Sequence, residues 1–182
     1  MSQPIHYSIK PDGQASITLE VYKTGLMKGK KHIFQFDRYE GELVFTPEDL
    51  EAARVSFAVD SSSMILKDKW VSASDRTKVL AVAKGEMLDV ARYPQVRFES
   101  TRIARIMGEY SVRGNLIIKD KPQPVYIEIR LNPNQTDHLQ IEGNSQIKLS
   151  DYGLKPPSAL LGAIGTKDVM SARFSLIAFP SD

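Results

Sequence analysis

The chain alternates apolar and polar residues over most of its length. In residues 15–22 every second side chain is apolar, which is the period of two expected for a β-strand with one buried face. Similar strand-length signals return at residues 34–36, 43–45, 55–59, 96–100, 110–116, 125–131, 139–149 and 168–179. Turn-forming residues interrupt the runs at Asp12-Gly13, Met107-Gly108, Lys121-Pro122 and Asn132-Pro133-Asn134. About eight antiparallel strands are therefore expected.

One segment departs from this period. Between about residues 72 and 88, Val79, Leu80 and Met87 fall at helical spacing, after a serine that can cap a helix. The pattern predicts an all-β fold, an eight-stranded antiparallel barrel with one amphipathic helix inserted between strands. A helix with a single apolar stripe must cover something, so we expect it to close one end of the barrel.

The length of the chain and the absence of repeats indicate how many domains it forms. Its 182 residues, 42% of them hydrophobic, are enough to bury one core. We see no internal repeat or linker, so residues 1–182 are expected to form a single domain. The longest uncharged stretch, residues 156–166, contains two prolines and two glycines and is predicted to be a loop rather than a membrane helix.

Strand parity identifies the residues that would face the barrel interior. Gly114, Gly143 and Ser145 share the inward parity, and such small residues would leave volume unfilled. Small residues also let a compact barrel taper, so parity alone leaves a ligand site and a filled interior as equal alternatives. The residues expected to contact a ligand are Phe45, Phe57, Val59, Val79, Leu80, Met87, Phe98, Val112, Leu116, Ile127, Ile129 and Ile147. Those expected at the rim are Trp70, Tyr93 and Tyr110.

Composition excludes several functions. The 24 Lys and Arg nearly balance 22 Asp and Glu, which argues against a nucleic-acid partner. The absence of cysteine removes disulfides, thiolate nucleophiles and Cys-based zinc sites. The first residues lack the features of a signal peptide, which favours the cytoplasm; a chain already trimmed of such a peptide would instead be periplasmic.

A search for reactive groups gives no catalytic site. His6, His32 and His138 are far apart and lack a second ligand at metal-site spacing, so no metal is expected. Residues 143–147 lack the second glycine of a nucleophile elbow. Asp75, Asp89, Arg76 and Arg92 flank the predicted helix and suit helix capping and ion pairing as well as an acid/base set.

A basic glycine-containing segment lies early in the chain. Residues 25–31 have glycine spacing one residue short of a phosphate-binding loop, and no Ser or Thr follows the lysine. Its lysines, together with Lys23, suit a solvated loop or a transient contact with an anionic membrane surface.

Several segments of the sequence resemble one known family. They are residues 23–26 followed by His32, then 39–47, 59–63, 88–101, 110–120 with Pro124-Val125, and 150–154. The most distinctive, 88–101, places an acidic residue before Tyr93-Pro94 and ends on Phe98-x-Ser100-Thr101. Over nearly its whole length the chain resembles the YceI-like family of lipid-binding proteins. It departs from the family at residues 119–123, where a Gly-Val-Thr turn is usual, and in lacking the secretion signal of many members.

The resemblance implies a lipocalin-like barrel with a helix at one end, which binds a long apolar chain without catalysis. We therefore predict a non-enzymatic protein that binds or carries a polyisoprenoid, quinone tail or fatty-acid derivative in the lumen, with no other cofactor. The alternative is a structural or protein-interaction barrel with a filled lumen and no lipid ligand. An enzyme using Asp89 and His32 would need both in one cleft. The identity of the ligand and the formation of a homodimer stay open.

Overall fold

The computed structural model describes residues 3–46, 48–132 and 137–181, and it is built almost entirely from strands. The strands are β1 (Ile5–Ile9), β2 (Ser16–Gly25), β3 (Lys31–Phe36), β4 (Tyr39–Phe45), β5 (Arg54–Asp60), β6 (Met64–Leu66), β7 (Gln95–Ile106), β8 (Glu109–Ile118), β9 (Lys121–Asn132), β10 (Leu139–Lys148), β11 (Ile164–Thr166) and β12 (Val169–Pro180). Four short helical segments accompany the helix α1 (Ala73–Ala81) in this part of the chain; they are η1 (Ser61–Ser63), η2 (Val82–Met87), η3 (Leu149–Tyr152) and η4 (Leu160–Gly162).

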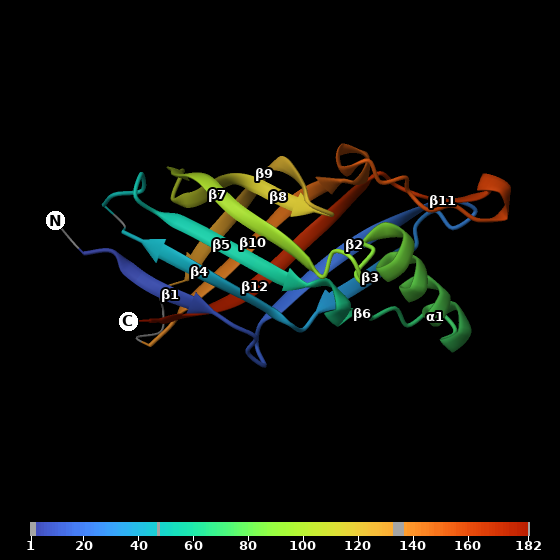
Figure 1. Ribbon diagram of the computed structural model, residues 1–182, viewed down its shortest axis with the longest axis horizontal. Helices are drawn as coiled ribbons and strands as arrows, with labels where there is room; N and C mark the ends of the chain where they lie inside the picture. The colour runs from blue at the N-terminus through green and yellow to red at the C-terminus, as the bar shows by residue number, and fades with distance from the viewer. Residues whose placement is uncertain (1–2, 47, 133–136, 182) are drawn as a thin grey trace.

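Eight of these strands close a barrel (Figure 1). The hydrogen-bonded order β1-β4-β5-β7-β8-β9-β10-β12 returns to its start because the end of β12 pairs with β1, with Pro180 opposite Tyr7. Every neighbouring pair in the ring is antiparallel. The predicted fold class, an eight-stranded antiparallel barrel with one inserted helix, is confirmed.

The membership of the ring differs from the prediction. On the side of β12 away from β10, residues 178–180 pair with β1, whereas residues 171–175 pair with β2. From β2 the sheet continues through β3 to β6, so these three strands form an extension beyond the ring (Figure 1). We expected β2 and β3 as barrel strands and did not expect β1. Its five residues do alternate, with Ile5, Tyr7 and Ile9 in phase, but the segment is short.

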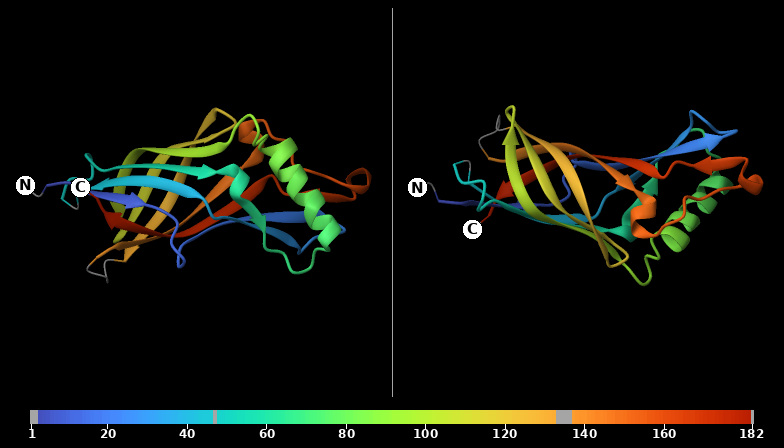
Figure 2. Two further views of the ribbon diagram at one scale, coloured as in Figure 1. Left: turned by 60° about the horizontal axis from the view of Figure 1, so that its bottom comes forward. Right: turned by 90° about the horizontal axis from the view of Figure 1, so that it is seen from above.

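The helix begins and ends where the sequence indicated. Ser72 caps α1 by accepting a hydrogen bond from the Asp75 N–H at 3.1 Å, and the helix continues as the π-helical segment η2 until Leu88. None of the residues of α1 or η2 is fully buried. Figure 2 shows the helix lying obliquely across the extension, at the end of the barrel away from the termini.

Turn geometry agrees only in part with the sequence. Met107-Gly108 forms the β7–β8 turn, and both residues have positive φ. The β8–β9 turn is Lys119-Asp120, both with positive φ, so Lys121-Pro122 belongs to β9 and is not the turn itself. Most of the predicted turn Asn132-Pro133-Asn134 lies outside the described residues, as does Pro47.

Two apolar clusters fill the interior. The barrel core lies within the ring and includes Ile9, Phe98 and Val112. The distal core lies between the extension and the helix; its buried members are Val21, Phe34, Met64, Leu66, Ile118, Leu149, Tyr152, Leu154 and Met170. Leu116 packs against both clusters. The distal core therefore lies at the barrel end that faces the helix.

Candidate functional site

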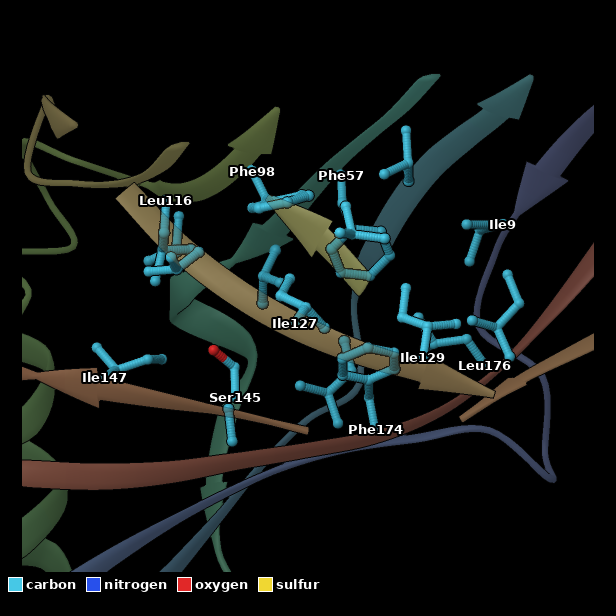
Figure 3. Close-up of a pocket in the computed structure, with 18 of the residues that line it drawn as sticks. Ile9, Phe57, Phe98, Leu116, Ile127, Ile129, Ser145, Ile147, Phe174 and Leu176 are labelled. Atoms are coloured by element: carbon cyan, nitrogen blue, oxygen red, sulfur yellow. The ribbon is translucent and has the colours of Figure 1, made fainter. Parts of the chain in front are cut away.

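The barrel holds a cavity of about 230 Å³, lined by side chains from the ring, from β2 and β3, and by Leu88, which follows η2 (Figure 3). Nine of the twelve residues predicted to contact a ligand line it: Phe45, Phe57, Val59, Phe98, Val112, Leu116, Ile127, Ile129 and Ile147. Strand parity therefore placed these side chains correctly. Whether they bind a ligand remains a prediction.

The three helical residues on that list do not line the cavity. Val79, Leu80 and Met87 pack against the distal core instead, and Leu88, the next residue after η2, does line the cavity. The helix lies at one end of the barrel, as expected, and it covers the distal core there. Its apolar stripe needs a partner, and the inner face of the extension supplies one before the barrel end is reached.

Several lining residues were missed, among them Ile9, Phe174 and Leu176. Phe174 and Leu176 belong to β12, whose alternation with Met170 and Ala172 was visible in the sequence and could have identified them. Ile9 was missed because β1 itself was not recognised.

The cavity wall is almost wholly apolar. Of its polar side chains, Ser145 donates its Oγ hydrogen to the backbone oxygen of Tyr126 at 2.9 Å. Tyr110, expected at the rim, does line the cavity and meets Phe45 edge to face. Trp70 and Tyr93 are not among the residues that line it. A wall of this kind suits a hydrocarbon far better than a polar ligand.

The inward glycines act differently from our expectation. A Cβ added at Gly143 would lie 2.4 Å from the ring of Phe174, and one at Gly114 would lie 2.4 Å from the ring of Phe98. The space over each glycine is therefore taken by a phenylalanine ring and is not empty. Because the rings can lie against the glycine backbone, they line the wall instead of crossing the lumen. The glycines thus leave the cavity open indirectly.

A buried histidine–aspartate contact lies outside the cavity. His32 Nδ1 is 2.6 Å from Asp68 Oδ2, and the Asp68 side chain is fully buried. The other carboxylate oxygen accepts the Ile33 N–H at 2.7 Å, and the His32 ring stacks on Trp70 at 5.3 Å between centroids. His32 is therefore satisfied by Asp68, and none of the described hydrogen bonds joins it to Asp89, as the enzyme alternative would require.

Three of the four charged residues that flank the helix, Asp75, Arg76 and Arg92, have structural partners. Asp75 accepts a hydrogen bond from the cap Ser72, and Arg76 donates to the backbone oxygens of Leu66 and Asp68. Arg92 lies over the ring of Tyr93. Among the described residues no group of three or more His, Asp or Glu side chains is arranged to hold a metal, and no helix is long and apolar enough to cross a bilayer.

Comparison with known proteins places this barrel among relatives. The family model of the YceI-like domain matches residues 7–176. The chain belongs to the YceI-like family. A UPF0312 protein of Yersinia pestis (strain Pestoides F) is 29% identical over 125 residues, which are 65% of this chain and 61% of the relative. A UPF0312 protein of Yersinia enterocolitica is 27% identical over 124 residues, again 61% of its length.

Solved structures share the fold of this YceI-like protein. Burkholderia cenocepacia BcnA superimposes with a TM-score of 0.71 at 21% identity, covering 90% of this chain and 96% of BcnA. A polyisoprenoid binding domain from Saccharophagus degradans, implicated in plant cell wall breakdown, has a TM-score of 0.65 at 10% identity and covers 97% of this chain and 99% of that domain. At these identities the likeness shows the fold.

A buried phenol in the distal core of the YceI-like barrel is expected to lower the free energy of unfolding at alkaline pH. Among the described residues the Tyr152 hydroxyl has no hydrogen-bond partner, and burial, aided by the charge of Asp151, raises the pKa of Tyr152 to about 12. The folded state thus holds this proton more tightly than the unfolded chain, whose tyrosine pKa is about 10. The stabilising contribution is complete below pH 10 and is lost as the pH rises through 12.

Tyr152→Phe should therefore lose less stability than wild type between about pH 10 and 12, while matching it near neutrality. Urea unfolding at several pH values measures the difference. Tyr126→Phe, which removes an exposed phenol, is the control. Parallel pH profiles for wild type and Tyr152→Phe would contradict the prediction.

Proposed function

We propose that this protein binds an elongated apolar chain inside the barrel and carries it without catalysing a reaction. The ligand class is a polyisoprenoid, a quinone tail or a fatty-acid derivative. The observation that carries the proposal is the almost wholly apolar cavity of about 230 Å³ inside the barrel. The polyisoprenoid binding domain that shares this fold supports the choice of ligand class.

Apolar burial alone can supply the affinity. A chain that buries ~500 Å² gains on the order of 12 kcal/mol at ~25 cal/mol per Å². Association costs at least ~4 kcal/mol, which leaves roughly 8 kcal/mol and a dissociation constant near the micromolar range. Because little of this depends on polar contacts, the protein should discriminate ligands by length and width more than by head group.

The volume of the cavity limits what it holds without rearrangement. A cavity of ~150 Å³ binds benzene, so one of about 230 Å³ has room for roughly ten carbon atoms. In the proposed complex a longer tail enters the distal core, which borders the cavity at Ile118 and Met170. Met64, Met87 and Met170 pack there, and methionine adapts to new shapes at low cost. The helix above it contains no fully buried residue, so it can shift.

This proposal predicts a dependence on chain length. For prenyl alcohols of increasing length, affinity should rise with each unit, and native mass spectrometry should detect a 1:1 complex. Hydrogen exchange in residues 73–87 should change only with chains longer than about ten carbons, because only these reach the distal core. Shorter chains that bind in the barrel are the internal control.

The result for the purified protein also tests the alternative. Organic extraction followed by mass analysis should recover an apolar molecule from the native protein. A structural or protein-interaction barrel predicts that no such molecule is recovered and that prenyl alcohols of any length fail to bind. Both negative results together would overturn the proposal.

A further inference from the structure

The end of the molecule farthest from the termini is built from two loops that lie side by side (Figures 1 and 2). One is the β2–β3 hairpin, residues 24–30, and the other is the loop with η4 and the start of β11, residues 158–165. The Leu26 N–H donates to the Ala163 oxygen at 2.9 Å, and Gly25 lies opposite Ile164. We call these two loops the distal tip.

The distal tip presents leucines to solvent. Leu26 is 76% exposed, Leu160 is 67% exposed and Leu161 is fully exposed. Leu160 and Leu161 also have positive φ, a conformation that disfavours residues other than glycine or asparagine. Neither packing nor backbone preference accounts for leucine at these two positions. An external apolar partner would account for it.

The residues around these leucines carry only positive charge. Residues 22–31 and 152–167 contain six lysines and no aspartate or glutamate: Lys23, Lys28, Lys30, Lys31, Lys155 and Lys167. Within the described parts of the chain, Lys31 is the one of the six that forms an ion pair, with Glu20 at 2.8 Å. Because the whole chain has a formal charge of +2, all other residues together carry −4. The distal tip itself holds Lys28 and Lys30, and the other four lysines lie in the segments that flank it, so the tip and its flanking segments are together positive.

We propose that the distal tip docks on the surface of an anionic lipid bilayer. The leucines enter the boundary between head groups and acyl chains, and the lysines contact the lipid phosphates. Trp70, which is partly exposed and lies under Lys30, belongs to the residue type preferred at this interface. A second copy of the chain fits less well, because it would oppose lysines with lysines. A nucleic acid leaves the leucines without a partner.

Docking through the distal tip would orient the barrel so that its distal core faces the bilayer. The distal core lies between the distal tip and the cavity, so a long tail that enters the distal core points toward the bilayer (Figure 1). This step rests on the proposed ligand function, whereas docking itself does not.

Cosedimentation with vesicles tests the docking. The protein should bind vesicles of 70% phosphatidylcholine and 30% phosphatidylglycerol at least tenfold more tightly than pure phosphatidylcholine, and 0.5 M salt should weaken binding, as expected for lysine contacts. Replacing both leucines (Leu160→Asp with Leu161→Asp) should reduce binding at least tenfold. Met107→Asp is the matched control, because Met107 is fully exposed on a turn with positive φ at the opposite end.

Two results would overturn the docking proposal: equal binding to both vesicle types, or equal loss in the control and tip variants. A change of sedimentation mass with the tip variant would assign the tip to a second copy of the chain instead. Binding of prenyl alcohol in vesicle-free solution should be the same for all variants. Loss of that binding would count against the ligand function, while docking is judged by the vesicles alone.

Discussion

Leu116→Asp is expected to abolish binding of an apolar chain, with affinity falling at least ~100-fold. Leu116 lines the cavity and also packs against the distal core, so it lies where a long tail would pass from one to the other. A carboxylate there either remains charged without a partner or becomes protonated, and both outcomes leave a polar group against the hydrocarbon. Titration with a prenyl alcohol, followed by native mass spectrometry, measures the loss.

The adjacent residue provides a matched control. Asn115 lies on the same strand with the opposite parity, so Asn115→Asp adds a carboxylate to the outer face of the barrel. This variant should bind like wild type. Because a buried charge can also unfold the protein, Leu116→Asn serves as a milder second variant, checked by circular dichroism. If both Leu116→Asn and Leu116→Asp fold and still bind the prenyl alcohol, the cavity is excluded as the ligand site.

The sequence predicted the fold and most of the cavity wall because both depend on a local period. Alternation in β5, β7, β8 and β9 orients each side chain without knowledge of its neighbours, and the lining residues on these strands follow directly. The order of strands depends on pairing between distant segments, which alternation does not encode. Alternation therefore did not reveal that β1 closes the ring while β2 and β3 extend beyond it.

Contacts between distant residues explain the remaining errors. His32 is buried against Asp68, 36 residues away, and no local spacing connects the two, so the sequence did not reveal this contact. The helix was placed correctly along the chain by its cap and its period, yet its packing partner is the distal core, which forms only when β3, β6 and η3 come together. The distal tip likewise joins Gly25 to Ile164, which are 139 positions apart in sequence.

The inward position of the glycines was predicted correctly, but their effect on the lumen was explained wrongly. Gly143 was expected to open the lumen by having no side chain, but the Phe174 ring occupies the place where its side chain would be. A phenylalanine without a glycine beside it would have to turn away from the wall, and in a barrel of this size it would project into the lumen. The width of the cavity thus depends on the pair and not on either residue alone.

Gly143→Ala should therefore narrow the cavity from a position that does not itself line it. The new methyl group would lie 2.4 Å from the Phe174 ring and 2.7 Å from the Glu128 carbonyl oxygen, so the ring must move toward the lumen. We expect binding of long prenyl chains to fall at least ~tenfold, with a stability loss of ~1–3 kcal/mol from overpacking. Isothermal titration and urea unfolding measure the two effects.

Two further variants separate the ring from the backbone. Gly13→Ala adds a methyl group where nothing lies within 4 Å, so binding and cavity shape should stay unchanged. In the double variant Gly143→Ala with Phe174→Leu, the contact with the Glu128 oxygen persists but the ring is gone, so long-chain binding should recover relative to Gly143→Ala alone. If the double variant binds no better than the single one, the strand backbone and not the displaced ring limits the cavity.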